Sequence, residues 1–294
     1  MFDPVTYALC KGGSGGVGLG ITGAEVGDVP VVSAVDANGA PTAWGAMDAF
    51  ANNAGAHNGI YRGKYLGAEV TQAQWDAIGA GTFDDLYIGD YWTINNVNWR
   101  IAAFDYWLRT GDTECTTHHA VIVPDTSLLA VDGSTTHWMN TSDTTTGAYV
   151  GTKFYSGGNT AKSTCISKAE GAFGAAHILS HREYFANATS NGYQSAGAWY
   201  DSKVDMMNEQ MVYGCRVFSN AVHGTNLPHA QAIDKGQLPL FALAPSFICD
   251  RVGWWLRDVI STSQFAVANA AGRCDGNYAS NNWLGVRPAF GICA

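Results

Sequence analysis

The chain has 294 residues, of which 47% are apolar and 14% are charged, with a formal net charge of −9. Disordered chains are poor in apolar residues and rich in charge. This composition therefore excludes a chain that is disordered over its whole length. There is no run of basic residues, which argues against nucleic-acid binding. Prolines interrupt the longest apolar stretches well short of the roughly 20 residues that a membrane-spanning helix needs, so we expect no membrane insertion.

The first residues lack the cationic start and the apolar middle of a secretory signal, so we expect the chain to fold in a reducing bacterial cytoplasm. Its seven cysteines are odd in number, scattered and without a Cys-x-x-Cys pair. We interpret them as mostly buried thiols, neither a disulfide framework nor a structural zinc site.

Residues 1–55 hold too little apolar surface to fold alone. Residues 11–20 are dominated by glycine, which is typical of a flexible or extended segment. Within residues 1–55 we predict a strand over 31–35, a turn at Asp36-Ala37-Asn38-Gly39 and a helix over 43–54. We expect this part to be a short N-terminal anchor that becomes ordered against a partner or another copy of the chain.

Residues 56–294 are denser in apolar and aromatic residues, and they carry patterns of both kinds of secondary structure. Alternation of apolar and polar residues predicts a hairpin over 86–94 and 97–106, joined at Asn95-Asn96. Further predicted strands are 120–123, 238–243, 254–259, 265–268 and 286–292, and predicted helices are 148–155, 161–173 and 201–213. Strands at both ends with helices between them predict an α+β fold, because a parallel doubly wound sheet needs strict alternation.

Residues 13–18 match the Gly-x-Gly-x-x-Gly pattern of dinucleotide-binding loops, and Asp36 follows at a suitable distance. The loop must open into a helix whose amino terminus holds the pyrophosphate. Further glycines and Pro30 make a helix directly after it unfavourable. We therefore expect no bound cofactor here.

Two histidine-containing groups have partial metal-site spacing. His177 and His181 are four residues apart, but the glutamate that a metalloprotease places directly after the first histidine is replaced by Ile178. The group of Cys115, His118 and His119 lacks a second ligand pair. We expect structural roles for both groups and no metal.

Three carboxylates, Asp201, Asp205 and Glu209, are spaced four residues apart and would line one face of a helix. A carboxylate pair is the machinery of many glycoside hydrolases. Carboxylate rows are also common on helix surfaces. A cell-wall hydrolase using Asp201 and Asp205 is accordingly one alternative function, although no other catalytic motif accompanies the row, and we expect a protein that is not an enzyme.

The segment 261–284 is the hardest to explain by folding alone. It is framed by two apolar segments that carry arginine, Trp254–Val259 before it and 285–290 after it. We expect Arg257, Asp258 and Arg287 of these frames to satisfy one another or backbone carbonyl groups. After residue 268 the segment consists almost entirely of small, asparagine, aspartate, arginine and aromatic residues, the composition of antibody-like binding loops. An ordinary polar hairpin would have a similar composition.

Seven phrases in a fixed order from about residue 60 onward carry a family resemblance: DLYIGD (85–90), NWRIA (98–102), HAVIVPD (119–125), SHRE (180–183), QLPLF (237–241), WLRDV (255–259) and GVRPAF (285–290). They resemble a family of gut-phage structural proteins similar to the variable proteins of diversity-generating retroelements, which share a C-type-lectin-like fold. Residues 3–8 and 34–44 also resemble the anchoring starts of phage tail or fibre proteins.

The resemblance implies a virion-borne adhesin, made in the cytoplasm of the host bacterium. Its lectin-like domain would span 56–294 and bind a host-surface protein or glycan. Residues 1–55 would attach it to other tail proteins of the virion, in a homo-oligomer for which fibre-like attachment favours a trimer. The variable region would be 261–284, with the ligand-binding residues Asn269, Ala271, Arg273, Asp275, Asn277, Tyr278, Asn281, Asn282 and Trp283.

In that family variation arises by substitution at template adenines, mostly in asparagine codons. Gln264 and Trp283 cannot arise from an asparagine codon in this way, so either they are fixed framework residues or the scheme does not hold at their positions. Calcium-dependent sugar binding would need a larger ligand cluster than Asp275 with Asn277, so we expect no metal. The remaining alternative is a structural head or tail protein with the same fold and no host ligand.

Overall fold

The computed structural model describes residues 28–37, 41–48, 53–129, 138–157, 161–186, 189–190, 193–194, 197–219 and 236–294. The chain divides into two compact units, Met1–Asn52 and Asn53–Ala294. The glycine-rich stretch 11–20 and the dinucleotide-like motif within it lie outside the described residues.

In the first unit, strands β1 (Asp28–Val35) and β2 (Pro41–Asp48) pair antiparallel. The strand predicted over 31–35 lies within β1. The helix predicted over 43–54 is wrong over 43–48, which belong to β2, while residues 49–52 lie outside the described residues. A turn signal directly after a strand favours a second strand that pairs with the first, and this long-range pairing overrides the weak helix propensity of 43–48.

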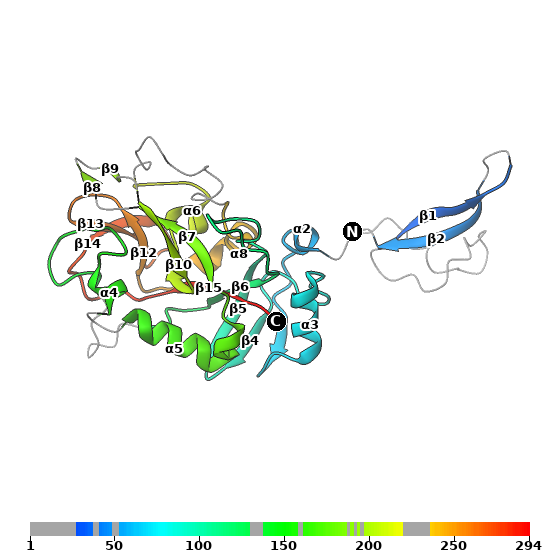
Figure 1. Cartoon of the computed structure of the whole chain (residues 1–294), viewed down its shortest axis with the longest axis horizontal. Coiled ribbons are helices and arrows are strands. Elements are labelled where there is room, and N and C mark those ends of the chain that lie inside the picture. The colour runs from blue at the N-terminus through cyan, green and yellow to red at the C-terminus, as the bar shows by residue number, and fades with distance from the viewer. Residues whose placement is uncertain are drawn as a thin grey trace. The chain divides into compact units, whose positions relative to one another are not determined.

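The second unit is built on a six-stranded sheet in the order β11-β15-β6-β5-β4-β3 (Figure 1). Its strands are β3 (Tyr65–Gly67), β4 (Tyr91–Ile94), β5 (Val97–Phe104), β6 (Ala120–Pro124), β11 (Val204–Met206) and β15 (Pro288–Ile292). The last strand of the chain lies between β11 and β6, and every residue of β6, β11 and β15 is buried. Segments distant in sequence therefore close one core.

A smaller sheet has the order β12-β13-β14, with β12 (Trp254–Val259), β13 (Gln264–Ala268) and β14 (Cys274–Tyr278). Two antiparallel pairs complete the strands, namely β7 (His181–Phe185) with β10 (Ala198–Ser202) and β8 (Thr189–Ser190) with β9 (Tyr193–Gln194). Among the described residues of the unit, the α-helices are α2 (Ala54–His57), α3 (Gln72–Ala80), α4 (Lys153–Ser156), α5 (Ala161–Phe173), α6 (Glu209–Tyr213) and α8 (Pro239–Leu243), and the 3₁₀ turns are η1 (Ala175–His177) and η2 (Pro245–Ile248). The predicted α+β class is confirmed.

Several predicted elements are confirmed. The hairpin turns at Asn95 and Asn96, both with positive φ, as a tight hairpin connection between twisted strands requires. The strand predicted over 120–123 is β6, and the helix predicted over 161–173 is α5. Strands β12, β13 and β15 also lie where predicted, although β15 begins at Pro288.

The helix predicted over 201–213 is wrong for most of its length. Residues up to Ser202 belong to β10, Val204–Met206 form β11, and only Glu209–Tyr213 are helical. The helix begins where the side chain of Asn208 accepts a hydrogen bond from the amide of Met211, a helix N-cap. The apolar residues of the stretch are buried as a core stripe would be, but they reach the core from different elements: Val204 and Met206 from β11, Met207 from the connection, and Met211 and Val212 from α6.

Two further predictions need correction. The strand predicted over 238–243 is helix α8, because Pro239 occupies the first helical position, where its fixed φ favours a helix start. The helix predicted over 148–155 is reduced to Lys153–Ser156, after turns in which Ala148 has a φ of 50°. Strand β14 was not predicted, because its sequence lacks apolar alternation.

Buried charges hold loops to the main sheet. Arg100 is buried, and its guanidinium donates to both carboxylate oxygens of Asp125, at 2.5 and 2.6 Å, and to the carbonyl of Gly89. The rings of Tyr91 and Phe247 lie 4.6 and 4.3 Å from its Cζ atom. The pair is therefore enclosed by aromatic rings and has little water to replace a lost partner.

We expect Asp125→Ala to lower the free energy of unfolding by about 3–5 kcal/mol, because it leaves the Arg100 charge buried without its partner. Urea denaturation followed by tryptophan fluorescence measures the change. Asp76→Ala, on helix α3, is the matched control and should stay within about 0.5 kcal/mol of the parent. Equal stability of the two variants would contradict the assignment.

Candidate functional site

Residues 261–284 form strand β13, a turn over 269–273, strand β14 and a closing loop. Strand β13 is the central strand of the small sheet, and Phe265, Ala266, Val267 and Ala268 are buried on it. On the neighbouring strand β12, Trp254 and Trp255 are 0% exposed. Strand β14 is an edge strand, so the segment places a polar outer strand on an apolar frame.

None of the nine predicted ligand-binding residues is buried. Six are exposed and three half-buried: the exposed set is Ala271, Arg273, Asp275, Tyr278, Asn282 and Trp283, and the half-buried set is Asn269, Asn277 and Asn281. Tyr278 and Trp283 are 53% and 56% exposed, which is unusual for such large rings. The nine side chains are thus available to a partner without unpacking the core.

The half-buried asparagines use their side chains within the segment. Asn269 Oδ1 accepts hydrogen bonds from the amides of Ala271 and Arg273, at 3.0 and 3.1 Å, and so fixes the turn between β13 and β14. Asn281 Nδ2 donates to Asn277 Oδ1 at 2.8 Å, and Asn281 Oδ1 accepts from an amide in the closing loop at 3.1 Å. Some of the asparagine side-chain groups that were predicted to bind a ligand are therefore used to hold the backbone of the segment itself.

The outer edge of β14 is capped by its own side chains. In the antiparallel register, the amides of Gly276 and Tyr278 point away from β13. Each bonds to the preceding side chain: Asp275 Oδ1 accepts from Gly276 at 2.8 Å, and Asn277 Oδ1 accepts from Tyr278 at 3.0 Å. These contacts use donors that would otherwise invite another strand to pair.

A loop from outside the segment holds both of its ends. Thr145 donates its amide to the carbonyl of Thr262 and its hydroxyl to that of Ser261, at 3.1 and 2.8 Å. Asp143 Oδ1 accepts from the amide and hydroxyl of Ser280, at 3.2 and 2.6 Å. The backbone of the segment is therefore anchored at several points.

Glu209, which the sequence placed in a row of carboxylates on a helix face, is instead buried beside the first residue of β14. Glu209 is 0% exposed and accepts hydrogen bonds from the amides of Val217, Phe218 and Ser219, the hydroxyl of Ser219 and the thiol of Cys274. Burial alone would raise the pKa of Glu209, but these hydrogen bonds outweigh it and hold the pKa below its ordinary value. Val217 and Phe218 are thereby held about half exposed.

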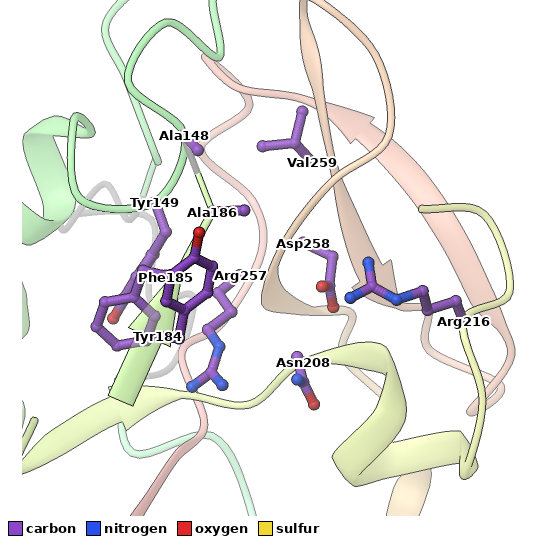
Figure 2. A pocket seen from close by; sticks show the side chains of 10 residues that line it. All are labelled: Ala148, Tyr149, Tyr184, Phe185, Ala186, Asn208, Arg216, Arg257, Asp258 and Val259. Atoms are coloured by element: carbon purple, nitrogen blue, oxygen red, sulfur yellow. The ribbon is translucent and has the colours of Figure 1, made fainter. Parts of the chain in front are cut away.

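A small pocket of about 40 Å³ lies next to the segment (Figure 2). It is lined by the end of β7, by consecutive residues of β12 and by the residue that caps α6; the full lining is Ala148, Tyr149, Tyr184, Phe185, Ala186, Asn208, Arg216, Arg257, Asp258 and Val259. Arg257 donates to Glu183 at 2.7 Å and to the carbonyl of Met206 at 3.2 Å. Arg287 donates to the carbonyls of Pro124 and Phe247. Both arginines bond to backbone carbonyls, as expected from the sequence.

Asp258, which lies on β12 and lines the pocket, has a raised pKa. Asp258 Oδ2 accepts the amide of Glu209 at 2.5 Å. Burial, followed by the neighbouring Glu209 carboxylate, raises the pKa of Asp258 from 3.8 to about 6. The carboxyl is therefore ionised at neutral pH and protonated in mild acid.

The other motifs are separated in the structure. The three carboxylates do not share a helix: Asp201 is exposed and pairs with Arg182 at 2.9 Å, Asp205 is buried and pairs with Lys162 at 2.5 Å, and Glu209 holds the loop described above. The predicted row of carboxylates on one helix face is therefore wrong.

The two histidine groups also have local structural contacts. His177 ends η1 and stacks on Trp75, and His181 begins β7 and contacts Glu183 at 3.2 Å, so the two do not share a helix. His118 pairs with Asp105 at 2.7 Å, and burial lowers the pKa of His119 to about 4. Within the described ranges, no three His, Cys, Asp or Glu side chains are grouped so as to hold a metal ion.

Six cysteines lie within the described residues, and all six are free thiols. Cys115, Cys165 and Cys293 are buried and Cys274 is half-buried, but Cys215 and Cys249 are exposed. The prediction of buried thiols is wrong for those two. Cys10 lies outside the described residues.

No family model matches the chain, and no curated protein or solved structure matches it. In the part of the chain that the structure describes, no helix is both long enough and apolar enough to cross a membrane.

Loss of a turn-holding asparagine should cost stability, whereas loss of an exposed neighbour should not. We expect Asn269→Ala to lower the free energy of unfolding by about 1 kcal/mol, because two backbone amides lose their acceptor. Asn282→Ala, the matched control, should change it by less than about 0.5 kcal/mol. Chemical denaturation of both variants distinguishes the roles, and the reverse ranking would show that the asparagine assignments are wrong.

The raised pKa of Asp258 predicts a pH-dependent stability. Between pH 3.8 and about 6 the folded protein holds a proton on Asp258 that the unfolded chain releases, so this group's contribution to stability falls as pH rises through that range. Asp258→Asn keeps an acceptor for the amide of Glu209 and removes the titration. We expect the variant to be about 1–2 kcal/mol more stable than the parent at pH 7, with a smaller difference at pH 4. Denaturant midpoints at the two pH values test this, and an equal difference at both would contradict it.

Proposed function

We propose that the chain is a receptor-binding protein of a bacteriophage, whose C-terminal face binds a ligand on the host cell surface. The proposal rests on one observation, the difference in exposure between two neighbouring parts of the small sheet. We call the strands β12 and β13 the frame, and the nine predicted ligand-binding residues the face. Most residues of strands β12 and β13 are buried, while the nine side chains predicted for binding are all at least partly exposed on or beside the edge strand β14. A surface whose side chains make few core contacts can change its sequence at little cost in stability.

The finer parts of the proposal rest on the sequence resemblance. They are a C-type-lectin-like arrangement of the second unit, diversification of 261–284 by a retroelement, and attachment of a trimer to the virion through residues 1–55. The α+β class and the capped, anchored hairpin are compatible with them. The proposal assigns no catalytic residue and no metal.

The exposed aromatic rings would supply most of the contact area. Tyr278 and Trp283 present large, rigid surfaces that lose little conformational entropy on binding. Arg273 and Asp275 are exposed charges of opposite sign and would contribute to specificity. Apart from the cap on Gly276, neither charge is committed to holding the frame.

Adsorption of the labelled full chain to a panel of intact bacterial strains tests the proposal. We expect saturable binding to some strains and not others. Tyr278→Ala should weaken it by about 5- to 150-fold, corresponding to about 1–3 kcal/mol for a binding hot spot. Tyr65→Ala, which removes a similarly exposed tyrosine on β3, is the matched control and should bind like the parent.

A variant with all nine predicted residues replaced by serine or alanine provides the decisive comparison. Loss of adsorption together with a circular dichroism spectrum like that of the parent supports the proposal. Undiminished adsorption of that variant would refute the assignment of the face.

A further inference from the structure

Two adjacent apolar side chains outside the predicted variable region are held in an exposed position. Val217 and Phe218 are 47% and 52% exposed, and both lie in the loop that follows helix α6. The amides of Val217, Phe218 and Ser219 donate to the carboxylate of Glu209, at 3.0, 3.0 and 3.1 Å. Glu209 itself is fully buried. Three consecutive amides that bind one buried carboxylate fix the loop backbone, so the exposure of the two side chains is a fixed feature of the fold.

This loop adjoins the turn and the strand that carry the face. Glu209 Oε1 accepts from the Phe218 amide at 3.0 Å and from the Cys274 thiol at 3.1 Å, so one oxygen atom bridges the loop and the first residue of β14. The hydroxyl of Tyr213, the last residue of α6, donates to the carbonyl of Gly272 at 3.3 Å, inside the turn between β13 and β14. The loop therefore lies beside the end of β14 where the turn residues of the face are.

The surface that the loop adds to the face is apolar, and its backbone amides are already bonded. Each amide has one hydrogen, and those of residues 217–219 are bonded to Glu209. On β14 the outward amides of Gly276 and Tyr278 are bonded to the side chains that precede them. A partner at this place therefore gains mainly by burying carbon, as a protein surface with exposed apolar side chains does.

Two other kinds of host surface fit this chemistry less well. A neutral polysaccharide presents hydroxyl groups over most of its surface, and these need hydrogen-bonding partners that the side chains of Val217 and Phe218 lack. A membrane or lipopolysaccharide surface carries anionic groups, which repel a chain of formal net charge −9. We propose that Val217 and Phe218 form an apolar anchor of the binding face, and that this anchor packs against apolar side chains of a host-surface protein.

The anchor lies outside residues 261–284. It would therefore keep its contact with the partner while the side chains of the face change. This inference rests on the proposed function, because the anchor is placed against the same partner as the face. It adds a contribution to binding that diversification of 261–284 leaves unchanged.

Adsorption of the labelled full chain to a bacterial strain that binds it tests the anchor. We expect Phe218→Ser to weaken adsorption at least ten-fold, and Val217→Ser to weaken it less because valine has the smaller side chain. Tyr65→Ser on β3 removes a side chain of the same 52% exposure and is the matched control, which should adsorb like the parent. The melting temperature of Phe218→Ser should stay within about 4 °C of the parent, with an unchanged sedimentation coefficient.

Treatment of the same cells, followed by washing, tests the class of partner. Proteinase K cleaves surface proteins and should abolish adsorption. Periodate oxidises the vicinal diols of sugars and should leave adsorption unchanged. Vesicles of phosphatidylethanolamine and phosphatidylglycerol should not bind the chain.

Parent-like adsorption of Phe218→Ser would overturn the anchor, and the proposed function would still stand if the nine-residue variant has lost adsorption. A large fall in the melting temperature of Phe218→Ser would show that the chain itself covers the ring, and a changed sedimentation coefficient that another copy covers it; either result overturns the inference. Adsorption that survives proteinase K or is lost after periodate, or binding to the vesicles, would overturn the protein partner. Failure of the chain to adsorb to any strain would refute the proposed function and the anchor together.

Discussion

The second unit depends on the burial of one guanidinium group. Arg287 is 0% exposed, and it donates to the carbonyl of Pro124 at the end of β6 and to that of Phe247 in η2. The ring centroids of Trp254 and Phe241 lie 5.4 and 5.5 Å from its Cζ atom. One side chain therefore joins the main sheet, helix α8 with η2, and the first strand of the small sheet. Burial lowers the pKa of Arg287 to about 10, so it stays charged at neutral pH and needs these acceptors.

These contacts of Arg287 explain why the small sheet can expose a polar strand. Strand β12 is fixed to the core through its tryptophans, β13 is buried against it, and β14 needs only the ladder and its asparagine-held turns. Side chains on β14 therefore contribute little to the core. The buried Glu209 and the Thr145 loop fix the surroundings of the segment without using its exposed side chains. A binding face requires a rigid backbone together with side chains that can be substituted without loss of stability.

Much of the frame could be predicted from the sequence, because its signals are local. Alternation and the Asn95-Asn96 turn specify the β4–β5 hairpin, and a stretch over 161–173 without proline and with several alanine and lysine residues specifies α5. The errors have local signals too: Asn208 marks a helix start inside the predicted 201–213 helix, and Pro239 marks another inside a predicted strand. In both places the residue that starts the helix, and not the spacing of the apolar residues, decides the element.

The site could be predicted only in part. The composition of residues 269–284 predicted an exposed segment. It did not predict β14, because this strand forms by pairing with β13 and its own sequence has no apolar alternation. The pocket was beyond the sequence, because Asn208, Arg216 and Asp258 converge from an α6 cap, a loop and β12. Such convergence is set by tertiary packing, which single-sequence patterns do not encode.

The separation of frame from face is most directly tested by two libraries. One randomises the six exposed positions, Ala271, Arg273, Asp275, Tyr278, Asn282 and Trp283, and the other randomises six buried positions, Trp254, Trp255, Leu256, Phe265, Ala266 and Val267. The measurement is the melting temperature of members drawn at random. We expect most of the first library to melt within about 4 °C of the parent and most of the second to fail to fold. Comparable losses in both libraries would contradict the account.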